Sequence, residues 1–147
     1  QPLVYRNAGR RSRSSDRRAE PVASGGVPVM ALIELERMVQ VWSYTVSHSQ
    51  LLLRATKDAE HPTRIDVLFK GVGAMSLPSV MADLRVREAD SAERASVLAS
   101  AAVAMPDERR CFILEGSGFR GWVLAGVVVF AEDEGEHFDP SQILDPQ

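Results

Sequence analysis

The stretch "TRIDVLFKGV", residues 63–72, alternates apolar and polar side chains and predicts a β-strand more clearly than any other part of the chain. Its two faces would hold three residues each: Ile65, Val67 and Phe69 on one, and Arg64, Asp66 and Lys70 on the other. Successive strand residues point to opposite faces, so we expect the first set to face a core and the second to face outward. Leu68 is the exception to this alternation.

Further strand patterns lie on both sides of this stretch. We expect strands near residues 35–46, 51–56, 83–88, 109–115 and 121–132, with a short edge segment at 74–80. Short polar or glycine-containing turns separate most of them, which indicates hairpins. The sequence therefore predicts an α+β fold that is mainly antiparallel β, with about six or seven strands forming a sheet or a partly open barrel.

One helix is expected, near residues 91–104. Asp90 and Glu93 have the spacing of a capping box, alanine dominates the segment, and Pro106 ends it. A strand through "SVLASAAV", residues 96–103, is the alternative interpretation.

Charge and composition change sharply at Met30. Residues 1–29 hold six arginines and two acidic residues, a net charge of +4, whereas residues 30–147 hold 11 basic and 18 acidic residues, a net charge of −7. The first segment has few large apolar residues to offset the entropy of ordering, so we expect a flexible basic arm followed by one globular domain of residues 30–147.

The same boundary supports a hypothesis about the start of the native chain. Gly25 and Gly26 precede Met30 at a distance where the codons of a bacterial gene can encode a ribosome-binding site. Residues 1–29 would then not belong to the native protein. The intact mass of the native protein decides between the two starts.

Composition limits the classes of protein. The longest uncharged run, residues 121–131, is too short for a membrane helix, and no signal-peptide pattern follows the basic arm. Cys111 is the one cysteine, so an intramolecular disulfide framework is excluded. We expect a cytoplasmic protein with no membrane contact.

Residues that carry chemistry are few and far apart. His48, His61 and Cys111 lie in separate segments, and no pair has the short spacing of zinc ligands. Ser47 neighbours His48, but adjacent residues usually point apart, so we expect no nucleophile and base pair there. Cys111 is interpreted as a core residue, although an exposed thiol beside Arg110 would be reactive.

Two other segments have simple interpretations. The acidic residues between 132 and 139 do not match a calcium loop and are expected to form a solvated strand end, with Phe138, Ile143 and Leu144 pinning the chain terminus to the domain. The glycines of "EGSGFRG", residues 115–121, indicate a hairpin loop and not a phosphate site. We expect no catalytic residue, metal or cofactor, and no enzyme.

Candidate contact residues remain. Trp42 and Tyr44 would share one strand face with Val46, and Phe119 and Arg120 would lie at a hairpin tip. We expect a non-catalytic interaction module whose acidic surface neutralises a basic protein partner, or which forms a homodimer through the edge near residues 72–80.

The alternative function is nucleic-acid binding through the arm, if the arm is native. Its contacts would be five arginines: Arg10, Arg11, Arg13, Arg17 and Arg18.

Overall fold

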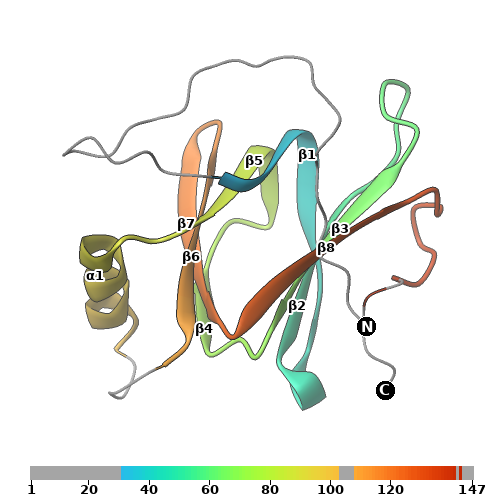
Figure 1. Cartoon of the computed structure of the whole chain (residues 1–147). Helices are drawn as coiled ribbons and strands as arrows, with labels where there is room; N and C mark the ends of the chain where they lie inside the picture. The colour runs from blue at the N-terminus through green and yellow to red at the C-terminus, as the bar shows by residue number, and fades with distance from the viewer. Residues whose placement is uncertain (1–30, 103–107, 142, 144–147) are drawn as a thin grey trace.

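The computed structural model describes residues 31–102, 108–141 and 143, which fold into one antiparallel sheet and one helix (Figure 1). The elements in chain order are β1 (Ala31–Thr45), a 3-10 turn η2 (Val46–His48), β2 (Gln50–Ala55), β3 (Arg64–Lys70), β4 (Ala74–Ser76), β5 (Val80–Glu88), α1 (Ser91–Ala101), β6 (Arg110–Gly116), β7 (Phe119–Ala125) and β8 (Val127–Asp133). The predicted α+β, mainly antiparallel fold is confirmed. The described residues form eight strands, because the long strand expected at residues 121–132 divides in two at Gly126 and the edge segment forms β4.

The strand order in the sheet is β4-β7-β6-β5-β1-β2-β3-β8. Its two ends are linked, because Gly126 alone joins β7 to β8 and residues 71–73 join β3 to β4. The Gly126 N–H donates to the Lys70 carbonyl and the Gly73 N–H donates to the Leu124 carbonyl, each at 2.8 Å. Hydrogen bonding therefore continues across the bend, and the sheet curves around one core.

Inward side chains from seven strands fill this core, and the described part of β4 contributes none of its buried residues. Val67 and Phe69 are fully buried there, as the alternation of β3 predicts, and the rings of Phe69 and Phe112 lie 5.6 Å apart. Burial of large apolar side chains of this kind is the main stabilising contribution in a small domain.

The outward face of the sheet is also covered in two places. Leu68, the exception in the alternation of β3, packs outward with Leu52 and Val129 against the chain that follows β8. Cys111, together with residues of β6 and β7, packs against Val97 of α1. Figure 1 shows α1 on one side of the sheet and the segment after β8 on the other, with β1 and β5 between them.

The helix begins as predicted. The Asp90 side chain accepts a hydrogen bond from the Glu93 N–H at 2.8 Å, and the Glu93 side chain accepts one from the Asp90 N–H at 2.9 Å, which completes the capping box. The helix ends at Ala101, where Ala102 adopts a left-handed conformation with φ of 56°, and not at residue 104. The strand alternative through residues 96–103 is therefore wrong for its described part.

A β-bulge in β1 overturns the predicted shared face of Trp42 and Tyr44. The register with β2 shifts between Val41 and Ser43, so that Tyr44 pairs with the core residue Leu51 while Trp42 packs against the outward cluster. Directly paired residues point to the same face, so the inserted residue places the two aromatic side chains on opposite faces.

None of the helices in the described ranges has the length and apolar character needed to span a bilayer.

Candidate protein-interaction site

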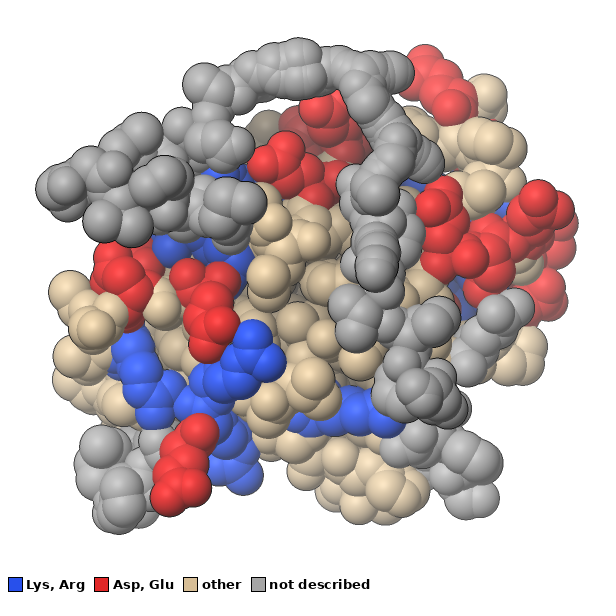
Figure 2. All heavy atoms as spheres, in the orientation of Figure 1, with Lys and Arg blue, Asp and Glu red and all other residues tan. Residues whose placement is uncertain are grey.

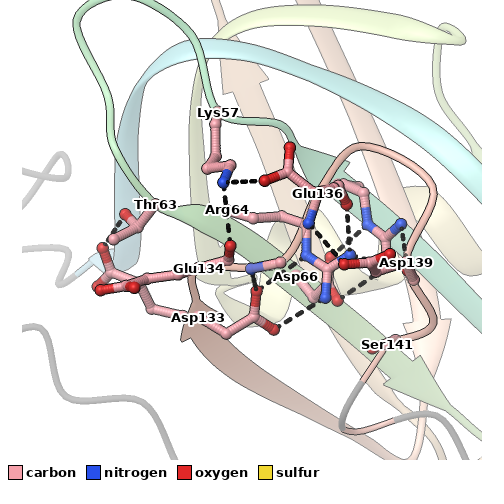
Figure 3. A network of polar contacts seen from close by, with 12 residues as sticks. Lys57, Thr63, Arg64, Asp66, Asp133, Glu134, Glu136, Asp139 and Ser141 are labelled. Atoms are coloured by element: carbon pink, nitrogen blue, oxygen red, sulfur yellow. Dashed lines mark hydrogen bonds and ion pairs between the residues drawn. The ribbon is translucent and has the colours of Figure 1, made fainter.

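Two buried ion pairs lie on the outward face of β2, β3 and β8. Arg54 Nε donates to Asp66 Oδ1 at 2.8 Å, and both side chains are only 1% exposed. Arg64 Nε donates to Asp133 Oδ1 at 2.9 Å (Figure 3). The strand register produces both pairs, since Arg54 lies opposite Asp66 and Arg64 lies opposite Asp133. Each guanidinium binds its carboxylate through two nitrogens, the strong geometry for this pairing.

The remaining guanidinium donors hold the chain that follows β8, which we call the strap, residues 134–141. Arg54 Nη1 donates to the carbonyls of His137 and Asp139, each at 3.0 Å. Arg64 donates to three strap carbonyls, those of Glu136, Asp139 and Pro140, at 2.8 to 3.1 Å. These bonds satisfy donors that burial would otherwise leave unpaired, and they fix the backbone of the strap.

The electrostatics of the pairs follow from these contacts. Burial alone would raise the pKa of Asp133, but hydrogen bonds from Arg64 and from the Gly135 N–H outweigh it and hold this pKa below its usual value. Burial would lower the pKa of Arg64, and the hydrogen bond to Asp133 with nearby carboxylates raises it instead. Both groups are therefore charged at neutral pH.

The loop between β2 and β3 joins the strap from the other side. Lys57 Nζ donates to the Glu134 carbonyl at 3.0 Å and to Glu136 Oε2 at 2.7 Å, and Thr63 donates to the Glu132 carboxylate. We call this loop, residues 56–63, and the strap together with Glu132 and Asp133 the acidic end. Its exposed carboxylates are Asp58, Glu60, Glu132, Glu134, Glu136 and Asp139.

Figure 2 shows this charge on the surface. Acidic side chains crowd the side of the molecule where the loop and the strap lie in Figure 1, whereas basic and acidic side chains lie together beside α1. The predicted solvated strand end is thus only partly correct, because Asp133 is held in an ion pair and Glu136 binds Lys57. Within the described ranges, no group of His, Cys, Asp or Glu side chains has the arrangement of a metal site.

Three aromatic side chains form what we call the aromatic cluster: Trp42, His137 and Phe138. The ring centroids of Trp42 and His137 lie 5.1 Å apart, those of Trp42 and Phe138 lie 5.6 Å apart, and those of His137 and Phe138 lie 4.4 Å apart. The guanidinium carbon of Arg54 lies 4.9 Å from the centroid of the Trp42 ring. Phe138 nevertheless remains 81% exposed, so it does not pin the strap as the sequence predicts. The arginine bonds do this, with Ile143 packing against the outward cluster, and Leu144 lies outside the described residues.

The structure does not bring the four predicted contact residues together. Trp42 belongs to the aromatic cluster, and Tyr44 is 40% exposed on the opposite face of β1. Phe119 is half-buried against the main core, and Arg120 donates to Glu93 Oε2 of α1 at 2.7 Å. These two residues begin β7, so they lie at the end of a strand and not at the tip of a hairpin.

The side chains that could take part in a reaction lie in different elements of the structure. His48 lies in η2, before β2, and His61 lies in the loop after β2, where it contacts Asp58 Oδ1 at 2.8 Å. That hydrogen bond holds the pKa of Asp58 below its usual value. Ser47 Oγ lies 3.2 Å from His48 Nδ1, so the expectation that these neighbours point apart is wrong. The pair is exposed on a turn, whereas Cys111 is buried beneath α1.

Cys111 is a core residue, 2% exposed beneath α1, and burial raises the pKa of its thiol. We predict that the native protein reacts with a thiol reagent at least about a hundredfold more slowly than the protein unfolded in urea, because the thiolate is the reactive form and the sulfur is covered. Absorbance of the released chromophore with Ellman's reagent measures both rates. Equal rates would contradict the buried assignment.

The five arginines predicted to contact nucleic acid, at positions 10, 11, 13, 17 and 18, lie outside the described residues. Comparison of the chain with protein-family models, with curated proteins and with solved structures found no match. The geometry of the acidic end is therefore the basis for assigning a function.

Proposed function

We propose that this protein is a non-catalytic interaction module that docks a basic protein partner on the aromatic cluster of its acidic end. The observation that carries the proposal is that Phe138 is 81% exposed, although two buried arginines fix the backbone on either side of it. A large apolar side chain that stays exposed on a fixed backbone contributes little to folding. It offers an anchor whose rotamer entropy is already reduced before a partner arrives.

The surroundings of the ring match the usual organisation of a binding surface. Interface hot spots are enriched in aromatic residues near the centre and are surrounded by polar residues that exclude water. Here the neighbours of Phe138 are carboxylates of the strap, including Glu136 and Asp139. Negative charge around an apolar centre favours a partner that presents basic side chains beside an apolar one.

The charge also affects the rate of association. A surface of one sign steers an oppositely charged partner and raises the association rate, and this effect declines with salt. An arginine or lysine of the partner would have two kinds of contact available at this end: the carboxylates and the open ring face of Phe138. The proposal therefore predicts binding that is sensitive to both salt and the aromatic ring.

The test is capture of partners from a lysate of the source cells with the tagged full chain, in the wild-type form and as Phe138→Ala. The matched control is Val46→Ala, because Val46 is 79% exposed but lies on η2, away from the strap. We expect the alanine at 138 to reduce the captured partner at least about tenfold, the scale of one hot-spot residue. Binding should fall as salt rises from about 0.05 to 0.5 M.

The remaining outcomes separate the alternatives. Capture that depends equally on Phe138 and Val46, or on neither, would overturn the proposal. Recovery of an untagged copy of the same chain would indicate the homodimer, and material lost on nuclease treatment would indicate nucleic acid bound through the arm. Either of these results would contradict the proposal that the protein docks a different, basic protein.

A further inference from the structure

The outward face of the sheet contains a strip that no described residue covers. It lies on β1 and β5, between the part covered by α1 and the part covered by the strap. Its large apolar side chains are Leu32, Met38 and Val80, which are 37%, 56% and 44% exposed. Met38 pairs with Ala82, and Gln40 pairs with Val80, so the apolar side chains of Met38 and Val80 are near neighbours on one face. We call Leu32, Met38, Gln40, Val80 and Ala82 together the open strip.

A covered arginine beside the open strip has donors without acceptors. Arg85 of β5 points outward opposite Glu34, yet its Nε and Nη2 atoms are buried and have no hydrogen-bond partner among the described residues. The nearest carboxylate oxygen, Oε2 of Glu34, lies 3.7 Å from Nε, beyond hydrogen-bond distance. Buried donors of this kind are costly to leave unpaired.

Other arginines of this protein show how such donors are satisfied. Arg54 and Arg64 donate to carbonyls of the strap. Arg37 Nη2 donates to the Thr56 and Thr63 carbonyls of the β2–β3 loop, although Arg37 Nε is itself buried without a hydrogen-bond partner among the described residues. In each case an irregular segment lies over a sheet residue and its main chain accepts from the guanidinium. No segment among the described residues accepts from Arg85 Nε or Nη2 in this way.

We propose that residues 1–29 of the same chain lie along the open strip and supply these acceptors. Only Met30 separates the segment from Ala31, the first residue of β1, so the chain connects the segment closely to the strip. Met38 is within about 23 Å of Ala31 along the strand, and 29 extended residues reach up to about 95 Å. A segment that turns back over β1 therefore covers the strip with chain to spare.

The composition of the segment is complementary to the side chains of β1 and β5 beside the strip. The segment carries six arginines against two acidic residues, whereas Glu34 and Glu36 are exposed on β1 beside the apolar side chains. Its own apolar residues would cover Met38 and Val80: Leu3, Val4, Tyr5, Val22, Val27 and Val29. This inference concerns a different part of the outward face from the aromatic cluster, so either proposal can fail without the other.

The test uses the full chain with a nitroxide spin label on Ser12→Cys and with ¹³C-methyl methionine. Buried Cys111 should take up no label, which the unsubstituted chain verifies. Because the proposal places the segment on the strip, the label would lie near Met38, and the Met38 methyl signal should lose at least about half of its intensity. Met75 on β4 is the matched reporter, since it is 40% exposed but lies in an edge strand outside the open strip, and its signal should be retained.

Two variants sharpen the result. Glu34→Gln with Glu36→Gln should restore most of the Met38 signal, and so should about 0.5 M salt. The control pair, Glu60→Gln with Glu134→Gln, removes the same charge from the acidic end and should leave the loss unchanged. Similar signals at Met38 and Met75, loss only when a labelled copy is mixed with an isotope-enriched copy, or a native mass that begins at Met30 would each overturn the inference.

Discussion

Replacing Asp66 by alanine is expected to lower the free energy of unfolding by about 3 to 5 kcal/mol, the cost of leaving one buried charge without its partner. Asp66 is 1% exposed and accepts two hydrogen bonds from Arg54, which is equally buried. Without the carboxylate, Arg54 keeps its strap carbonyls but loses the one negative charge it binds at this site. Urea denaturation followed by circular dichroism at neutral pH measures the change.

Two controls show whether the effect belongs to the buried pair. Glu136→Ala removes an exposed partner of Lys57 in the same region and should cost no more than about 1 kcal/mol. The double variant Arg54→Met with Asp66→Leu removes both charges, and apolar replacement of a buried pair is often close to neutral. It should recover part of the loss, and the part not recovered includes the two bonds from Arg54 to the strap carbonyls. A loss below about 1 kcal/mol for Asp66→Ala would contradict the assignment.

The alternation of β3 predicts which residues face inward, but it does not show what covers the outward ones. Arg64 and Asp66 point outward as expected, yet both are buried, because the strap lies over them. The residues that cover Arg54 are 83 and 85 positions away in the chain. Apolar and polar side chains alternate with a period of two whether the polar face of the strand meets solvent or is covered by a distant segment. The local sequence pattern therefore cannot distinguish the two cases.

The position of Trp42 illustrates the second limit of the sequence. Strand character at residues 35–46 is predicted and found, but one inserted residue between Val41 and Ser43 separates the faces of Trp42 and Tyr44. A β-bulge changes no composition or hydrophobicity, and a slip of one residue reverses every later side chain. The aromatic cluster could therefore be found only from the structure. The sequence shows only that one of its members, Phe138, lies in an acidic segment.

A second polar network, under α1, gives the remaining prediction. Arg87 is 7% exposed on β5 and donates through two nitrogens to both oxygens of Glu93, each at 2.8 Å. Glu115 binds the same guanidinium at 2.8 Å, and Arg120 donates to Glu93 at 2.7 Å. The hydrogen bond from Arg87 is the main cause that lowers the pKa of Glu93 from 4.5 to about 2. One carboxylate thus links the start of the helix to strands β5 and β7.

This lowered pKa fixes the sign of a pH dependence. The folded form holds the charged carboxylate more strongly than the unfolded chain does, so the stabilisation is present above pH 4.5 and is lost as the pH falls toward 2. Each pKa unit corresponds to about 1.4 kcal/mol, and solvent screening of this partly exposed side chain leaves a contribution of about 2 kcal/mol. Glu93→Gln should therefore be less stable than the wild type by that amount at pH 7.

The difference between the two proteins should shrink with acid, because the wild-type carboxyl becomes neutral like the amide that replaces it. Urea unfolding at several values between pH 7 and pH 2 gives this difference directly, and other titrating groups cancel since both proteins contain them. Glu36→Gln, on the exposed face of β1, is the matched control and should change the free energy of unfolding by less than about 0.5 kcal/mol throughout. A difference for Glu93→Gln that stays constant or grows as the pH falls would show that the loss is one of packing, and that the Arg87 pair does not hold the helix by charge.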